Sequence, residues 1–353
     1  MGYFCGQIYT FIPYMRQLFP LLHSALYFNT AYVGLASKPL MDYRASLEQE
    51  FFNEADAYKR NAIARLEAST KTVADFLNAP LSQTFLVHNF SIGVRYCLEY
   101  LPERTRVLTL KEDYPSLLNA LEERQLDVTA VPVTVDVETR VQEALRQAHF
   151  DVLAISMVNY TTGLKFNMKA LEAIKKAHPE LLIMVDGTQW VGTEAIDVQN
   201  SPIDIMVGSG YKWLLAGFSS GYLYCSAFFF ERFKLDPTAL WERIFVGHFD
   251  YLGAASLAFA VQQLQQWDFE QLMIHKHALD AQLQKGLEAS GRLWPLTLQR
   301  EAHSGIFNIS GTEEDVANLQ KKGVHCSYRG TGIRLSAHFY NTEEEIEQLL
   351  QLL

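Results

Sequence analysis

The sequence is short of positive charge and of long apolar runs. Its 353 residues hold 30 Lys and Arg against 40 Asp and Glu, a formal net charge of -10. Such a charge repels phosphate backbones and anionic lipid surfaces, so neither nucleic acid nor a membrane is an expected partner. No apolar run approaches the roughly 18 to 20 residues that a bilayer crossing needs.

Cysteine is also scarce. The four cysteines, Cys5, Cys97, Cys225 and Cys326, are scattered without CxxC or Cys/His ligand spacing. Neither a disulfide framework nor a metal site is therefore expected. The first 25 residues are rich in aromatics, but prolines and an arginine interrupt them, which is a poor secretory signal. We expect a cytoplasmic protein.

From residue 84 onward, short apolar runs alternate with longer amphipathic ones. This alternation predicts an α/β fold in which helices cover both faces of a parallel sheet. The predicted strands lie at 85–87, 107–110, 128–133, 152–156, 182–185, 203–207 and 222–225. The predicted helices between and before them lie at 58–78, 139–148 and 167–178.

A second, smaller unit is expected after residue 240. A long helical region at 252–289 leads into three predicted strands, GIFNIS, GVHCSY and GIRLSA. Asn341 or Thr342 is expected to start a terminal helix whose first turn is acidic. The predicted organisation is an N-terminal arm (1–25), a large domain (26–240) and a small α+β C-terminal domain (241–353) that includes the interdomain helix.

Two charged residues follow neighbouring apolar strands. Asp186 ends LLIMVD, and Lys212 follows IDIMVG in the sequence SGYK. The carboxyl ends of strands form the ligand crevice of open α/β sheets, so both side chains should enter one site. A desolvated lysine can form a Schiff base with an aldehyde cofactor, and a carboxylate opposite it can hold a pyridinium nitrogen protonated.

The pattern D-G-x-Q followed by S-G-x-K-W resembles the class V aminotransferase family of fold-type I pyridoxal-5'-phosphate (PLP) enzymes, which includes cysteine desulfurases, kynureninases and isopenicillin N epimerase-like proteins. The likeness extends from YFNTAYVG at 27–34 to IRLSAHFYNTEEEIE at 333–347. It implies a mainly parallel seven-stranded sheet, PLP as cofactor, an amino acid as substrate, and a homodimer with active sites at the subunit interface.

The resemblance also implies roles at the cofactor ring. Lys212 would be the Schiff-base lysine and Asp186 the partner of the pyridine nitrogen. Gln189 would donate near the ring hydroxyl. Tyr114 stands where many relatives stack a histidine on the ring, and its phenol offers a comparable face. Tyr211 replaces the histidine that commonly precedes the lysine.

The phosphate is expected at the turn HNFS. There, Phe90 and Ser91 would bring backbone amides to it, and Ser209 would add a hydroxyl. Gly247 and His248 occupy the place of a Gly-Thr pair that, in relatives, reaches the phosphate of the neighbouring subunit.

Three residues are expected near the substrate. Arg334 matches the arginine that grips the α-carboxylate through a two-pronged ion pair; the alternative is a surface ion pair with the acidic run 343–345. Tyr160 stands where desulfurases carry an asparagine. Asn29 is a candidate substrate contact, and a plain turn into Gly34 is its alternative.

The sequence leaves the reaction open between transaminase, lyase and epimerase chemistry. Sulfur transfer of the cysteine desulfurase or selenocysteine lyase type is an alternative, but only eight positions separate Cys326 from Arg334, so we expect a buried strand thiol. A catalytically inactive binding or assembly protein is the remaining alternative. It is motivated by the departures at Tyr160, Tyr211 and His248.

Overall fold

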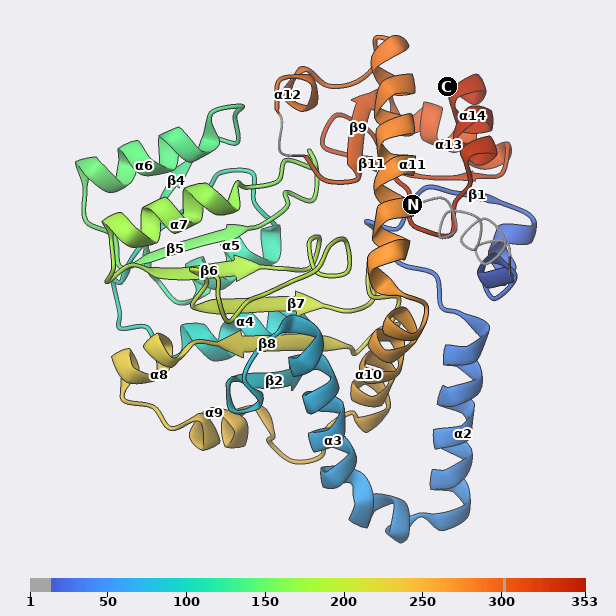
Figure 1. The fold of residues 1–353 in the computed structure, drawn as a ribbon. Coiled ribbons are helices and arrows are strands. Elements are labelled where there is room, and N and C mark those ends of the chain that lie inside the picture. Colours follow the sequence, from blue (N-terminus) through green and yellow to red (C-terminus); the bar gives the residue numbers. More distant parts are fainter. Residues whose placement is uncertain (1–13, 301–302) are drawn as a thin grey trace.

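The computed structural model describes residues 14–300 and 303–353. Its centre is a seven-stranded sheet, drawn with its helices in Figure 1. In spatial order the strands are β2 (Thr84–Val87), β8 (Gly221–Cys225), β7 (Ile205–Ser209), β6 (Leu182–Asp186), β5 (Val152–Ser156), β3 (Arg106–Leu110) and β4 (Asp127–Val131). Strand β8 runs in the opposite direction to the other six strands, which are parallel to one another. The predicted mainly parallel seven-stranded sheet is confirmed.

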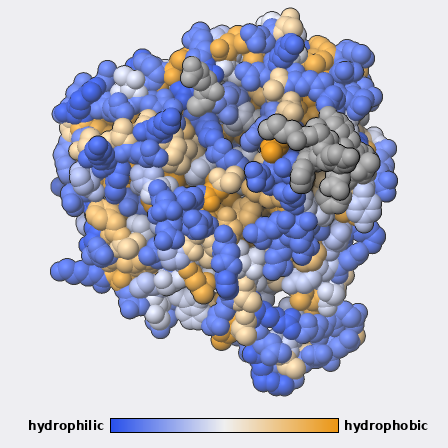
Figure 2. All heavy atoms as spheres, in the orientation of Figure 1, coloured by the Kyte–Doolittle hydropathy of each residue, from blue (hydrophilic) through white to orange (hydrophobic). Residues whose placement is uncertain are grey.

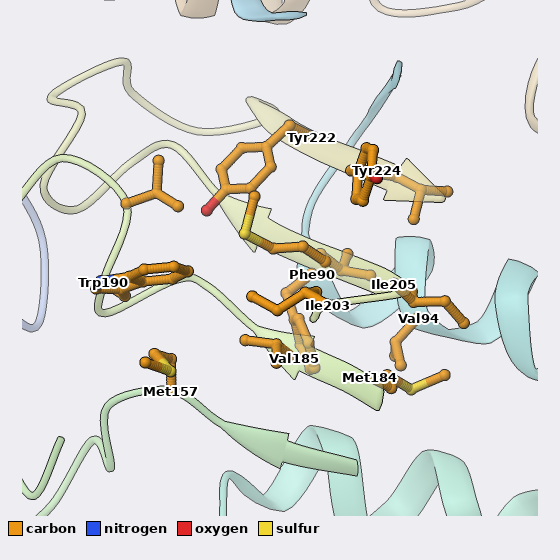
Figure 3. Close-up of a cluster of buried hydrophobic side chains, with 14 of the residues drawn as sticks. Phe90, Val94, Met157, Met184, Val185, Trp190, Ile203, Ile205, Tyr222 and Tyr224 are labelled. Carbon is orange, nitrogen blue, oxygen red and sulfur yellow. The ribbon is translucent and has the colours of Figure 1, made fainter. Parts of the chain in front are cut away.

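The composition of the strands explains their order. Every residue of β5, β6, β7 and β8 is buried, as expected for hydrophobic strands that are covered on both faces. Strand β4 lies at the edge and has exposed residues. Figure 3 shows how Val185, Ile205 and Tyr222 from three neighbouring strands gather in one apolar cluster.

Helices connect and cover these strands. Those that follow the sheet strands are α4 (Phe90–Leu98), α5 (Pro115–Glu123), α6 (Val137–Gln147), α7 (Met168–Ala177), α8 (Ala227–Phe233) and α9 (Pro237–Ile244). Ahead of the sheet come η1 (Pro20–His23), α2 (Lys38–Glu54), α3 (Asp56–Leu77) and η2 (Leu81–Gln83). Helix α3 packs along α10 (Tyr251–Gln266). The predicted helices at 58–78, 139–148 and 167–178 are confirmed to within two residues.

The region 252–289 is two helices rather than one. Helix α10 ends at Gln266, and α11 (Phe269–Ala289) begins after Asp268, whose left-handed backbone (φ 61°) breaks the helix. The Asp268 carboxylate accepts from the amide of Gln271 and so caps the second helix. The prediction of a continuous helix was wrong because helical periodicity does not report such a break.

The C-terminal part forms its own small sheet. Strands β11 (Ser327–Arg329), β12 (Gly332–Ser336) and β9 (Ile306–Ser310) are antiparallel, and α12 (Pro295–Leu298), α13 (Glu313–Lys321) and α14 (Glu343–Leu352) accompany them. The segment GVHCSY was expected as one strand. It instead divides at Cys326, because β10 (Val324–His325) pairs with β1 (Leu26–Tyr27) while β11 pairs with β12.

Thr342 is the residue that starts α14, in a reciprocal capping box with Glu345. The neighbouring Asn341 instead donates to the carbonyl of Tyr27 and to Glu345. Two hydrophobic clusters organise the molecule, and α11 contributes Leu272 to the first and Leu283 to the second. The domain boundary near residue 240 stays a prediction.

The described part of the N-terminal arm is packed. Phe19 is 1% exposed and lies edge-on against Trp267 and Phe339. Further on, Gly34 donates to the carbonyl of Tyr211, and a Cβ at this glycine would collide with the carbonyl of Lys212. The segment that contains Gly34 therefore lies directly against the turn that carries Lys212.

Polar residues cover most of the face drawn in Figure 2, and apolar ones gather in separate groups. Of the helices in the described ranges, none combines the length and apolar composition that a bilayer crossing demands. Within the same ranges, no group of three or more His, Cys, Asp or Glu residues is arranged to hold a metal ion.

Candidate active site

A cavity of about 380 Å3 lies where β5, β6 and β7 end and α4 begins. This is the position at which open α/β sheets bind ligands. Most of the residues predicted to hold the cofactor line it: Phe90, Ser91, Tyr114, Asp186, Gln189, Ser209, Tyr211 and Lys212. Tyr160, predicted near the substrate, lines it too. Residues from distant parts of the sequence thus meet around one space of ligand size.

Lys212 is a buried amine without a hydrogen-bonding partner. Its residue is 7% exposed, and no acceptor for Nζ occurs among the described residues. Two aromatic rings flank the amine, with centroids 5.8 Å (Tyr114) and 5.6 Å (Tyr211) from Nζ. Burial, followed by the positive charge of Arg334, lowers the pKa of Lys212 to about 7, although Asp186 opposes the shift.

Asp186 ends β6 and is 5% exposed. Its Oδ1 accepts from the amide of Thr188 at 2.8 Å. Burial raises the pKa of Asp186, while this hydrogen bond and the charge of Lys212 act in the opposite direction. A buried carboxyl of this kind suits a partner that brings its own proton and positive charge, as a pyridinium does.

The first turn of α4 forms the wall beside Ser209. Asn89 caps this helix by accepting from the amide of Ile92 at 3.0 Å. The amide of Phe90 donates to Ser209 Oγ at 2.9 Å, and the hydroxyls of Ser91 and Ser116 are 2.6 Å apart. The first amides of a helix have no intrahelical acceptor and favour an anion.

Gln189 is fixed at both ends of its amide. Its Nε2 donates to the carbonyl of Ala31 at 2.9 Å, and its Oε1 accepts from Trp213 Nε1 at 2.7 Å. One N–H of the amide is left for a group in the cavity. The role predicted for Gln189 at the ring hydroxyl stays a prediction.

Tyr114 is held in place by Asp113, which the sequence analysis did not single out. Asp113 is 3% exposed and accepts from the amides of Tyr114 (2.6 Å) and Ser156 (2.8 Å) and from the Ser156 hydroxyl. Burial raises its pKa. The phenol ring of Tyr114 packs edge-on against Tyr160 and Phe90, with centroid separations of 5.5 and 5.9 Å.

Arg334 lies in β12 and is 2% exposed. Its Nη1 donates to the carbonyl of Tyr160 at 2.6 Å, while Nε and Nη2 are buried without an acceptor. The alternative, an ion pair with the run 343–345, does not form among the described residues, where Glu345 pairs with Arg16. Burial lowers the pKa of Arg334 to about 9. Unpaired donors on a buried guanidinium are costly, which favours an incoming carboxylate.

Arg334 and the remaining predicted residues are not among those that line the cavity of their own chain. Gly247 and His248 are exposed in the loop between α9 and α10, and their contact with a neighbouring subunit stays a prediction. The backbone of Asn29 pairs with that of Ser336, and no donor to its buried Oδ1 occurs among the described residues. Thr188 and Phe218 line the cavity but were missed, because neither residue type marks a site in sequence.

The residues present fit PLP. The primary amine of lowered pKa matches the aldehyde of PLP, and the buried carboxyl matches its pyridine nitrogen. The start of the helix, with its nearby hydroxyls, matches the phosphate. These groups line one cavity whose volume is in the range of cofactor sites. The chemistry of the donor set, rather than any single residue, makes the match.

Comparisons with known proteins agree with this geometry. The family described as aminotransferase class-V matches residues 37–240. A probable cysteine desulfurase of Pyrococcus abyssi is 22% identical, with 96% of each chain covered.

Two solved structures share the fold. One is the apo structure of cysteine desulfurase from Thermococcus onnurineus NA1, with a TM-score of 0.81, 19% identity and 96% of each chain covered. The other is the cystine C-S lyase C-DES in complex with cysteine persulfide, with a TM-score of 0.85, 18% identity and coverage of 95% of this chain and 98% of that one. Because the family match spans more than half of the sequence, the chain belongs to the aminotransferase class-V family and is a PLP-dependent enzyme.

Proposed function

We propose that the protein converts a free amino acid, with Lys212 as the residue that carries PLP and then moves the α-proton of the substrate. The observation that carries this proposal is the buried, unpartnered amine of Lys212 in the same cavity as the buried carboxyl of Asp186. When bound, PLP supplies an electron sink for negative charge at the α-carbon of the substrate.

The protein groups divide the remaining work. Asp186 would keep a proton on the pyridine nitrogen, Tyr114 would contact the ring, and Gln189 would donate to the ring hydroxyl. Arg334 binds the α-carboxylate through Nε and Nη2, the two donors that have no other acceptor. This ion pair fixes the orientation of the amino acid relative to Lys212.

Phe90, Ser91 and Ser209 would hold the phosphate at the start of α4. The helix dipole and the free amides would stabilise its negative charge there. Gly247 and His248 of a second subunit would complete this end of the site.

Proton transfer by Lys212 follows from its pKa. Burial and nearby positive charge bring that pKa to about 7, so a large fraction of the amine is neutral at neutral pH. A base whose pKa lies near the working pH is the most effective one. Lys212 is therefore suited to take the α-proton once the substrate amine has displaced it.

We propose that the reaction needs none of the three thiols that the structure describes. Cys97 and Cys225 are wholly buried, and Cys326 is 2% exposed with a pKa raised by burial to about 11. None of the three lines the cavity. Transamination, β-elimination and epimerisation remain the candidate reactions; Cys5 lies outside the described residues.

A second candidate function is cleavage of the C–S bond of a sulfur-containing amino acid. It is supported by the relative described as a probable cysteine desulfurase and by the neighbour described as a cystine C-S lyase. Sulfide or persulfide formed from cysteine or cystine by wild-type protein and by Cys326→Ala alike would fit elimination. Loss of the product in Cys326→Ala would instead assign that thiol to sulfur transfer.

The test of the main proposal is a panel of amino acids added to the PLP-loaded protein. The absorbance of the cofactor is followed, and the products are identified by mass spectrometry. We expect at least one amino acid to change the spectrum and to yield a keto acid, an elimination product or the opposite enantiomer. No spectral change with any amino acid would favour the catalytically inactive alternative.

We also propose a cytoplasmic homodimer. The thiols of Cys97 and Cys225 are 3.9 Å apart and not bonded, which suits a reducing compartment. An apolar groove of about 480 Å3 that includes Ile63, Leu81 and Trp241 supports a protein interface. Light scattering during size-exclusion chromatography gives the mass: about 80 kDa, twice the chain mass of 40.2 kDa, supports the dimer, and 40.2 kDa contradicts it.

A further inference from the structure

Arg329 is a second arginine beside the site, and neither the sequence analysis nor the cofactor accounts for it. It ends β11, on the hairpin that leads into β12 and Arg334. We propose that Arg329 binds a second carboxylate of the substrate, so that the enzyme acts on amino acids that carry two carboxylates. This inference rests on the proposed function, in which Arg334 binds the α-carboxylate.

Backbone contacts fix both arginines beside the same segment. The side-chain amide of Asn308 donates to the carbonyls of Thr161 and of Arg329, each at 3.0 Å. The carbonyl of the preceding Tyr160 accepts from Arg334 at 2.6 Å. Since Tyr160 lines the cavity, the end of the hairpin lies next to the cavity wall.

A second contact places the guanidinium of Arg329. Its Cζ lies 5.1 Å from the centre of the Tyr32 ring, which is 52% exposed. Tyr32 belongs to the segment that is bonded to the site through Ala31 and Gln189 on one side and Gly34 and Tyr211 on the other. Arg329 is half-buried and so lies between this segment and the solvent.

The charges around Arg329 are unbalanced. Over residues 14–300 and 303–353, no carboxylate lies within 4.0 Å of Arg329 or of Arg334. Yet the chain carries an excess of acidic residues, and the largely buried side chain of Arg300 pairs with Glu138 at 2.6 Å. The positive charge of Arg329 lowers the pKa of both Lys212 and Arg334, which places its field inside the cavity.

One carboxylate does not need both arginines. Arg334 has two donors free, and these suffice for the two oxygens of an α-carboxylate. Its remaining Nη1 is taken by Tyr160. Arg329 donates through Nη1 to the carbonyl of Tyr328 at 2.7 Å and keeps its other donors for another anion. The side chain of a dicarboxylic amino acid or the far half of cystine would each supply such an anion.

The test compares ligands that differ only in this charge. Dissociation constants are measured by spectral titration of the PLP-loaded protein for aspartate against asparagine, glutamate against glutamine, and cystine against S-(methylthio)cysteine. We expect wild-type protein to prefer the charged member of at least one pair by roughly tenfold or more. The preferred pair identifies whether a side chain or a second amino-acid half carries the carboxylate.

Arg329→Gln should remove this preference and leave the affinity for the uncharged member unchanged. Equal weakening of both members would overturn the proposal, because Arg329 would then bind the α-carboxylate; so would a preference that survives, or none in wild-type protein. Arg146→Gln, an exposed arginine of α6, is the control for net charge and should change nothing.

A binding experiment separates this inference from the proposed function. Titration calorimetry with succinate against succinamate needs no reaction with PLP. We expect succinate to bind more tightly than succinamate to wild-type protein and equally to Arg329→Gln. That result would hold even if no amino acid reacted, whereas equal binding of the two compounds to wild-type protein would refute the role of Arg329 alone.

Discussion

Two buried lysines lie close to Trp213, Lys212 in the sequence and Lys276 in space, and their surroundings differ. Lys276, on α11, is 0% exposed; its Nζ is 2.5 Å from the Asp280 carboxylate and 5.0 Å from the centre of the Trp213 ring. Lys212 directly precedes Trp213, is 7% exposed, faces a cavity and has neither a hydrogen bond nor an ion pair within the described residues. Burial alone thus does not mark a reactive lysine; burial without a partner does.

The largest expected effect separates the two lysines by chemistry. Lys212→Arg should abolish the imine absorbance of PLP and lower turnover by roughly 10^3-fold or more, because the group that moves the proton is lost. Lys276→Met should keep the absorbance. Visible spectra and turnover of both variants check this, and an unchanged spectrum in Lys212→Arg would refute the distinction.

The second effect distinguishes Lys212 from Lys276 by the unfolding free energy that is lost when each lysine is replaced. Lys276→Met leaves the Asp280 carboxylate without its partner in a buried position, which should cost about 3–5 kcal/mol of unfolding free energy. The double variant Lys276→Met, Asp280→Leu should recover much of this loss. Urea unfolding of the three proteins measures it, with Lys212→Met as the matched lysine control. Equal losses in Lys276→Met and Lys212→Met would show that the two sites are not different.

Asp186→Asn removes the negative charge opposite Lys212 and keeps the shape of the side chain. Without the negative charge the pyridine nitrogen loses its proton, and we expect turnover to fall roughly a hundredfold. Lys212 should still capture PLP, because its amine is untouched. Steady-state kinetics beside absorbance measure the two properties, and full turnover in Asp186→Asn would contradict the assignment.

The smallest expected effect is a shift in the pH dependence of PLP capture by Lys212. The pKa of Lys212 is lowered to about 7, so the reactive neutral amine forms as the pH rises through 7 rather than through the ordinary lysine range near 10. Capture of PLP by cofactor-free protein should therefore accelerate between about pH 6 and pH 8. Arg334→Gln removes a positive charge and should move the midpoint upward, as stopped-flow absorbance can show; a downward shift would contradict this cause.

Much of the fold followed from the sequence because its strands are continuous apolar runs that end in turn residues. The strand that ends in Asp186 and the turn that holds Lys212 were located in this way. The break at Asp268 and the division of GVHCSY at Cys326 were not predicted. The first depends on the left-handed backbone of one residue, and the second on tertiary pairing, in which β10 meets β1 while β11 meets β12.

The candidate site was predictable where a residue of suitable chemistry stands at or just after the end of a predicted strand, as Asp186 and Lys212 do. The roles of Asp113 and Arg329 were not, because their importance comes from partners distant in sequence. Asp113 contacts Ser156, 43 positions away. Arg329 is notable for the carboxylate that it lacks, and no sequence pattern records a missing partner.

We expect Lys212, and not Lys276, to carry PLP. Reduction of the PLP-loaded protein with borohydride, followed by proteolysis and mass spectrometry of the peptides, identifies the modified lysine. We expect a phosphopyridoxyl group on the peptide that contains Lys212 and an unmodified peptide for Lys276. A modification at Lys276 or another lysine, or none at all, would contradict it.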